Sequence, residues 1–356
     1  GYRVLFDRIT DSANPDALEV VKEEDAPKKT NFDVPAYLPL DKLGTVNLPQ
    51  PPSSASPKGT HPRFGDAHEF TDRSNGFLWE GAENALMFVP KTRRLIVSFD
   101  NIHGIKNAET RWPWGMKRIT QDLECSLLGV MAVYRNWFRH GFVHDAFNAL
   151  RNSGFFDQFD DILFFGASMG GFGALTYSRL APGSRVLAFA PQTTLDRRIL
   201  PEDDRWGWTK KLDWDGPYAD AAADTAAASA IYLISDPFFE PDARQIARLS
   251  QANVVQLRTP FMGHQLPNAF EQMGILRPLL QAAASGNLDS DLFYNLYRAR
   301  RDLPRFQHDL LMEAERRKKV RSAIRICEYT LKKRKAGNIQ RSLDRLREEL
   351  VESEKV

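Results

Sequence analysis

Three residues, Ser168, Asp236 and His264, have the types and the chain order that nucleophilic catalysis requires. Ser168 lies in Gly166-Ala167-Ser168-Met169-Gly170-Gly171, directly after the apolar run 161–165 and before a helix-competent stretch. Gly-x-Ser-x-Gly between a strand and a helix is typical of a nucleophile elbow, a tight turn that exposes a serine hydroxyl at the tip of a sheet. The alternative is an ordinary glycine-rich turn, and the flanking pattern favours the elbow.

Such an elbow requires an acid and then a histidine, each after a later strand. Asp236 directly follows the apolar run 231–235, and His264 follows the run 254–258 in a short loop. Taken singly, Asp236 is equally typical of a turn before Pro237, and His264 of an exposed loop or helix cap. Asp196 is the rival acid, and the cleaner strand-end position favours Asp236.

The chemistry follows from these groups. A serine hydroxyl is a weak nucleophile until an imidazole takes its proton, and a carboxylate holds that imidazole in the correct tautomer. The developing oxyanion needs backbone N–H donors. One is expected from Met169, directly after the nucleophile, and the other from the loop 100–104 after Phe99.

The chain must supply a sheet that positions these residues. Short apolar runs alternate with helical patterns, which predicts an α/β fold with a mainly parallel sheet covered on both faces. The runs are 77–80, 85–89, 94–99, 126–133, 161–165, 185–190, 231–235 and 254–258, and the helical patterns are 145–151, 172–180, 241–252 and 266–284.

Residues 77–284 resemble the α/β-hydrolase superfamily, in which many esterases and lipases carry the elbow Gly-x-Ser-Met-Gly-Gly. The resemblance implies an α/β-hydrolase fold and an acyl-serine mechanism. Family members often carry His-Gly-x after the strand that corresponds to 95–99, and x donates its amide to the oxyanion. By position that residue is Ile102, although this chain has Asp100-Asn101 where His-Gly is usual.

Four regions differ in composition. Residues 1–76 form a Pro-rich arm, 77–285 the catalytic domain with a Trp-rich cap at about 193–230, and 286–356 a basic helical hairpin. From Arg298 onward 18 Lys/Arg face 10 Asp/Glu, a net charge of +8, and the total of +2 leaves −6 for the rest. A basic tail on an acidic body favours a homo-oligomer or a protein partner bound through the C-terminal helices.

Aromatic residues are expected at the substrate. Trp112 and Trp114 follow the oxyanion loop, and Trp206 and Trp208 lie in the cap, where they would stack on sugar rings or line an acyl channel. The alternative is a cap that buries its own small core. The expected substrate site also includes Asn101, Phe238 and Phe261.

These patterns predict a serine hydrolase that cleaves a small-molecule or saccharide carboxylic ester, with a thioester left open. The first alternative is an acyltransferase that uses the same triad on an alcohol or sugar acceptor, and the second is a non-catalytic scaffold that acts through its tail. No cofactor, metal, nucleic acid or transmembrane segment is expected. Two widely separated cysteines and no leader pattern favour a reducing, cytoplasmic location.

Overall fold

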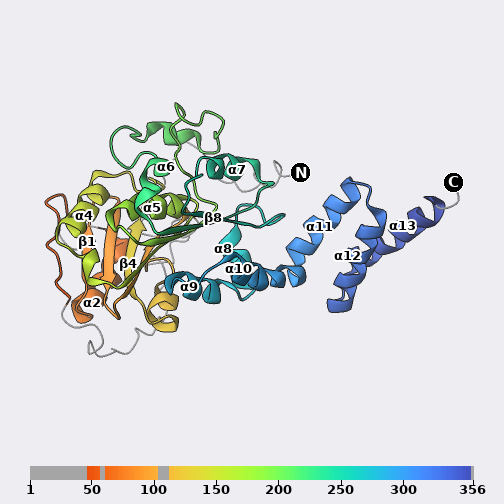
Figure 1. Ribbon diagram of the computed structural model, residues 1–356, viewed down its shortest axis with the longest axis horizontal. Coiled ribbons are helices and arrows are strands. Elements are labelled where there is room, and N and C mark those ends of the chain that lie inside the picture. Colours follow the sequence, from red (N-terminus) through yellow and green to blue (C-terminus); the bar gives the residue numbers. More distant parts are fainter. Residues whose placement is uncertain (1–45, 57–60, 103–111, 354–356) are drawn as a thin grey trace.

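The computed structural model describes residues 46–56, 61–102 and 112–353 (Figure 1). Most of the arm predicted for residues 1–76 lies outside these ranges, as do His103 and Gly104 of the expected oxyanion loop. Nothing further is described of the arm's first 45 residues.

One eight-stranded sheet forms the centre of the protein. Its strands are β1 (Phe77–Glu80), β2 (Asn84–Val89), β3 (Arg94–Phe99), β4 (Ser126–Ala132), β5 (Asp161–Ala167), β6 (Arg185–Phe189), β7 (Ala230–Ser235) and β8 (Val254–Arg258). They lie side by side in the order β1-β2-β4-β3-β5-β6-β7-β8. The β1–β2 and β2–β4 pairs are antiparallel and the other pairs are parallel. The predicted strands therefore all occur, within two residues of their expected ends.

Helices cover both faces of the sheet (Figure 1). In chain order they are α2 (Gly65–Arg73), α4 (Gly141–Asn152), α5 (Met169–Tyr177), α6 (Ala221–Asp224), α7 (Glu240–Ala247), α8 (Leu266–Gln272), α9 (Leu276–Ala284), α10 (Ser290–Tyr297), α11 (Pro304–Arg316), α12 (Val320–Lys333) and α13 (Gly337–Ser353). One buried apolar cluster joins the sheet to α4 and α5, and a second joins it to α8, α9 and α10.

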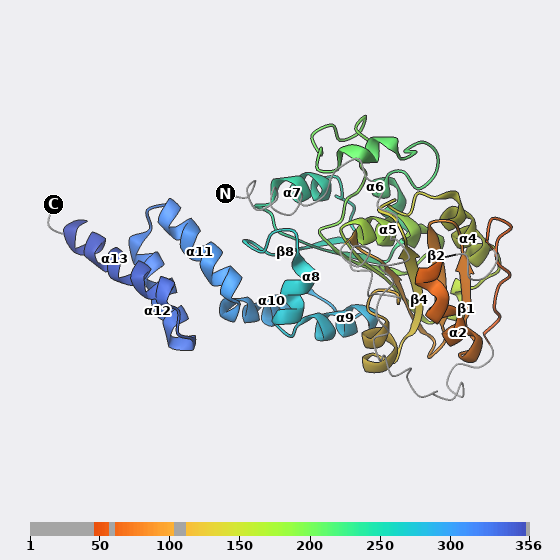
Figure 2. The same cartoon turned by 180° about the vertical axis from the view of Figure 1, so that it is seen from behind.

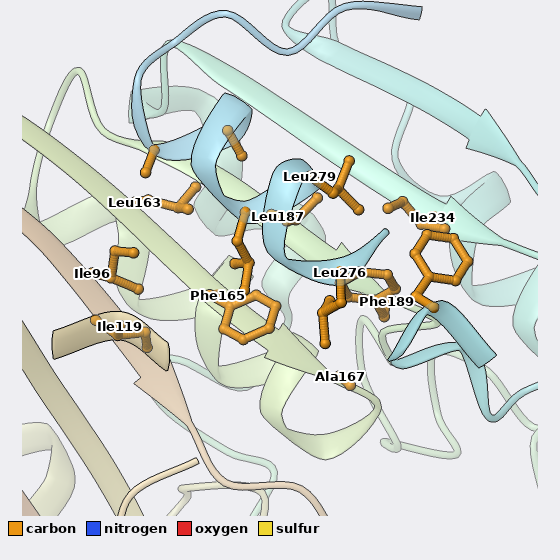
Figure 3. Packing of buried hydrophobic residues seen from close by; sticks show 14 of the residues in the cluster. Ile96, Ile119, Leu163, Phe165, Ala167, Leu187, Phe189, Ile234, Leu276 and Leu279 are labelled. Carbon is orange, nitrogen blue, oxygen red and sulfur yellow. The ribbon is translucent and has the colours of Figure 1, made fainter. Parts of the chain in front are cut away.

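Alternation along the strands explains the two clusters. Successive side chains of a strand point to opposite faces. On β5, Phe164 belongs to the α4/α5 cluster, whereas Leu163 and Phe165 belong to the α9 cluster. Figure 3 shows the α9 side, where Leu276 and Leu279 lie over the strands. Both faces of the sheet are therefore buried from solvent, which is why the strands are continuous apolar runs in the sequence.

Two breaks and one helix differ from the sequence prediction. The single helix expected at 266–284 divides into α8 and α9 at Gly274, whose φ of 69° suits a helix C-terminus. In the C-terminal tail, the helical chain is interrupted between α11 and α12, where Lys318 has φ of 54°. Helix α2 lies inside the predicted irregular arm, and Ala67 on it is buried in the α9-side cluster. Neither Lys318 nor the polar sequence of α2 carries a recognisable signal.

Helices α11, α12 and α13 extend away from the sheet in both views (Figures 1 and 2). They bury a small core of their own, made of Leu311, Ala314, Ala323, Cys327, Ile339, Leu343 and Leu346. A cavity of about 390 Å³ lies where α11 and α12 approach Phe261 of the body. In the parts of the chain that the structure describes, no helix has the length and apolar character to cross a membrane.

His144 on α4 makes stability depend on pH. Burial, aided by the charge of Arg139, lowers the pKa of His144 from 6.5 to about 4. Between these values the unfolded chain binds the proton and the folded chain does not, so the free energy of unfolding falls as pH drops from 6.5 to 4. We expect His144→Phe, which keeps a ring against Tyr218, to flatten this slope.

The measurement is urea unfolding at pH 4.5, 5.5, 6.5 and 7.5. The exposed His308, replaced by Gln, is the matched control and should leave the slope in place. An unchanged slope in His144→Phe would contradict the assignment.

Candidate active site

The elbow after β5 has the strained backbone that exposes a nucleophile. Ser168 has φ of 54° and ψ of −117°, a conformation rare for a residue with a side chain. A Cβ on Gly166 would lie 2.0 Å from the carbonyl oxygen of Gly170, and one on Gly170 would lie 2.6 Å from that of Phe99. Both positions therefore require glycine, and the Ser168 N–H is held by the Phe189 carbonyl at 2.9 Å.

The structure brings Ser168 and His264 together, as their order predicted. His264 Nε2 lies 3.0 Å from Ser168 Oγ, and His264 Nδ1 lies 2.7 Å from Oδ2 of Asp242. A carboxylate only accepts, so Nδ1 carries the proton and Nε2 is the acceptor for the serine hydroxyl. The Asp242 side chain is 0% exposed and that of His264 is 21% exposed.

Asp236 does not contact the imidazole, which corrects the acid expected from the sequence. Its Oδ1 accepts the Phe238 N–H at 2.9 Å and its Oδ2 accepts the Gly263 N–H at 2.8 Å. Burial raises the pKa of Asp236. This carboxylate thus links the end of β7 to the loop that carries His264. Its role resembles the turn-forming role that the sequence offered as the alternative.

Asp196, the rival acid, is also elsewhere. Its carboxylate pairs with Arg198 at 2.7 Å, and that contact lowers the pKa of Asp196. Asp242 was missed because it belongs to α7 rather than to the end of a strand. After Ser235 the chain leaves the sheet and starts α7 at Glu240, and the first turn of that helix carries Asp242 to His264. Acidic residues in the first turn of that helix, Glu240 and Asp242, were the available signal.

The two residues expected to donate backbone N–H groups to the oxyanion are Met169 and Ile102. Met169 is the first residue of α5, and the first N–H groups of a helix lack partners within it and attract negative charge. Ile102 packs against the α4/α5-side cluster, and Asn101 is half-buried next to it. The loop beyond Ile102 lies outside the described residues. Asp100 anchors its start by accepting the N–H groups of Trp114 and Ala132.

Gln192 is a neighbour of the nucleophile that the sequence did not reveal. It is fully buried, and its amide lies beside Ser168 Oγ, with Nε2 at 3.3 Å and Oε1 at 3.4 Å. The indole N–H of Trp137 donates to Oε1 at 3.2 Å. Because an indole only donates, this bond fixes the amide orientation and leaves Nε2 as the donor toward the serine.

Aromatic rings surround His264 on two sides. The ring of Trp206 lies 6.5 Å from the imidazole and that of Phe239 lies 5.9 Å from it. Trp206 and Trp208 are half-buried and both contact Trp137. These are the cap tryptophans expected at the substrate.

The other expected substrate residues fall into two groups. Phe238 is 51% exposed, and its ring lies 5.1 Å from that of Phe261 at a tilt of 35°. The two residues are close in sequence to Asp242 and His264. Trp112 and Trp114 instead pack against the α9-side core, with Trp114 stacked on Phe165 at 4.3 Å. Trp214 of the cap is buried against Phe172 of α5, so this part of the cap joins the α4/α5 cluster and does not form a core of its own.

Among the described residues, no three His, Cys, Asp or Glu side chains gather closely enough to hold a metal ion. The polar groups of the site are instead committed to one another through hydrogen bonds. This arrangement of side chains is able to deprotonate the Ser168 hydroxyl and present its oxygen to an electrophilic carbon.

Comparison with known proteins finds solved structures of low similarity to this chain. No protein-family model matches the chain, and no curated protein matches it in sequence. A hormone-sensitive lipase from a metagenome library is 15% identical over 75% of this chain and 95% of its own, with a TM-score of 0.39. A thermostable carboxylesterase from a metagenomic library is 12% identical over 63% and 94%, with a TM-score of 0.38.

The capsule O-acetyltransferase of Neisseria meningitidis serogroup A is 11% identical over 56% of this chain and 93% of its own, with a TM-score of 0.34. The mainly parallel sheet, covered on both faces and carrying a strained serine turn after β5, has the architecture expected of the predicted α/β-hydrolase fold.

Proposed function

We propose that this protein is a serine-dependent acyl hydrolase that cleaves a carboxylic ester through an acyl-serine intermediate. Ser168 is the nucleophile, His264 the general base and acid, and Asp242 the carboxylate that orients the imidazole. The observation that carries the proposal is the unbroken chain Ser168–His264–Asp242, with spacings of 3.0 and 2.7 Å, at a strained turn of a parallel sheet.

The reaction balances with these groups alone. Ser168 Oγ attacks the ester carbon while its proton passes to His264 Nε2, and the carbonyl oxygen becomes an oxyanion. That oxyanion is stabilised by the Met169 N–H and, as the resemblance implies, by that of Ile102. The alcohol leaves with the proton from Nε2. A water then attacks the acyl-serine and gives one proton to Nε2. Nε2 passes that proton to Ser168 Oγ as the acid leaves, which regenerates the free serine.

Acyl transfer to an alcohol or sugar is the second candidate. The same acyl-serine serves both reactions, and only the group that replaces water differs. The half-buried indoles of Trp206 and Trp208 near His264 favour this candidate, because indole faces stack on sugar rings. The exposed Phe238 beside Phe261 would receive the acyl part in either reaction.

A fluorophosphonate probe tests the acyl-serine directly. We expect stoichiometric labelling of the folded protein, with the mass increase on the peptide that contains Ser168, and no labelling of Ser168→Ala. Ser153→Ala, at the end of α4, is the control that should label normally. Absence of labelling in a properly folded protein would favour a non-catalytic scaffold.

The acceptor is identified in a second experiment. p-Nitrophenyl esters of increasing acyl length are turned over with and without added glycosides or simple alcohols. A free acid as the sole product means hydrolysis, whereas an acylated sugar that appears at the expense of the acid means transfer.

A further inference from the structure

A buried arginine of the cap bridges the orienting carboxylate of the candidate triad to a second carboxylate. Arg205 donates from one guanidinium nitrogen to Asp242 Oδ1 at 2.7 Å, and from two others to Asp203 at 2.5 and 2.7 Å. The Arg205 side chain is 3% exposed and both carboxylates are 0% exposed. Such a pairing is bidentate on Asp203, which fixes the plane of the guanidinium.

Asp242 is therefore shared between two cationic or polarisable partners. Its Oδ2 receives the Nδ1–H of His264 and its Oδ1 receives Arg205. Burial alone would raise the pKa of Asp242, but the charges of His264 and Arg205 outweigh it and hold that pKa below its usual value. The same carboxylate thus stabilises both an imidazolium and a guanidinium.

Helix α7 holds the second carboxylate as well. Gln245 lies one turn after Asp242 on the same face, and its Nε2 donates to Asp203 Oδ2 at 2.7 Å. Its Oε1 accepts from the N–H and the hydroxyl of Thr193. The cap segment around 203–206 is therefore fastened to α7 at two positions, both without access to water.

A second series of contacts links the cap segment 203–206 to Ser168. The guanidinium of Arg205 lies 4.6 Å from the centre of the Trp206 ring, which packs on Trp137. Trp137 holds Gln192, and Gln192 lies against Ser168. Arg205 is thus connected to His264 through Asp242. It is also connected to Ser168 through the side chains of Trp206, Trp137 and Gln192.

We infer that Arg205 is a positioning residue for the proposed reaction, which locks the carboxylate of Asp242 onto His264 and sets, together with Asp203, how strongly His264 binds its proton. This inference rests on the proposed function for its kinetic consequences. It assigns to the cap segment 203–206 an electrostatic role in addition to covering the site.

Two other charged groups, Asp236 and Arg305, lie near His264, but they approach it only through Gly263. Asp236 reaches it only through the Gly263 N–H, and the guanidinium of Arg305 at the start of α11 lies 3.0 Å from where a Gly263 Cβ would be. Arg305 is itself within 3.7 Å of Asp309. Neither contacts the imidazole or its carboxylate in the described contacts, whereas Arg205 shares that carboxylate with it.

The test uses two substitutions with effects of opposite sign. Arg205→Met keeps the aliphatic stem but removes the cation that competes for Asp242, so the imidazolium gains stability. We expect the acid limb of the pH profile of kcat/KM to move up by about one pH unit. Asp203→Asn removes the other partner of Arg205, leaves its charge to Asp242, and should move the limb down. Arg205→Lys should keep the limb near its original position.

The substrate is p-nitrophenyl acetate, and the pKa of His264 is also followed by NMR of ¹³C-labelled histidine in a Ser168→Ala background, without any turnover. Arg198→Met is the control, because Arg198 lies in the same cap and pairs with Asp196 and Asp215. If Arg205→Met does not fold, Arg205→Gln replaces it, because glutamine also removes the cation but keeps a side-chain amide that can donate to Asp203 or Asp242, and the same upward shift is expected.

The outcomes separate the two proposals. A wild type that neither turns over esters nor labels at Ser168 contradicts the proposed function, yet the NMR titration still reports on Arg205. A wild type that is active, with both limb and NMR pKa unmoved in Arg205→Met and Asp203→Asn, overturns the inference. So do shifts of the same sign in both variants, or an equal shift in Arg198→Met.

Discussion

Ser168→Ala is expected to lower kcat for p-nitrophenyl esters by about 10⁶, and His264→Ala by a similar factor. In the proposed mechanism the hydroxyl forms the covalent bond and the imidazole carries its proton, so acylation does not proceed by this route when either group is missing. The two groups act as a unit, and the double variant should therefore lose little more than each single one. Steady-state turnover of all three variants is the measurement.

Stability provides the control for this prediction. Alanine keeps the Cβ, so the backbone strain at φ of 54° is the same in both proteins, and only the hydrogen bonds of the hydroxyl to His264 and Gln192 are lost. We expect the melting temperature of Ser168→Ala to stay within a few degrees of the wild type. Retention of more than about one hundredth of the turnover, or additive losses in the double variant, would contradict a shared catalytic role.

The residues of the elbow were predictable because their constraints are local. Gly166 and Gly170 must be glycine since a Cβ at either would meet backbone within 2.0 and 2.6 Å, and this requirement is written in consecutive residues. The strands were predictable for a related reason. Strands that are buried on both faces must be apolar throughout, so each one stands out from its polar surroundings.

His264 was identifiable because parallel strands bring their carboxyl ends to one edge of the sheet, where the loops after β5 and β8 lie near each other. The same reasoning selected Asp236 and was wrong about its partner. A carboxylate at a strand end has backbone N–H groups within reach, and Asp236 is saturated by those of Phe238 and Gly263. Nothing in the spacing distinguishes a carboxylate that ties a loop from one that orients a ring.

The network behind His264 could not be read from the sequence. Arg205 and Asp242 are 37 positions apart, and each lies in a polar stretch typical of a solvated surface. Only the packing of the cap on α7 removes these side chains from water. Burial is a property of the tertiary structure, and with it the charges become strong enough to influence one another.

Asp242→Asn is expected to lower kcat by about 10⁴, whereas Asp236→Asn should lower it by no more than about tenfold. An asparagine at 242 no longer holds the imidazole as a carboxylate does, so the wrong tautomer and an unstabilised imidazolium result. An asparagine at 236 keeps one acceptor for a backbone N–H and leaves the other N–H of the pair unsatisfied. Its main cost is therefore to stability, about 1–3 kcal/mol.

The two variants are compared by kcat on p-nitrophenyl acetate and by urea unfolding. Asp242→Asn also leaves Arg205 with Asp203 as its remaining carboxylate, so its free energy of unfolding should fall too, and stability alone does not separate the variants. The two variants are separated by combining each substitution with His264→Ala. Because a triad carboxylate acts only through the imidazole, Asp242→Asn should cost little kcat once His264 is absent. If its full 10⁴ loss persists in that background, or if Asp236→Asn shows the larger loss in the presence of His264, Asp242 is not the orienting acid.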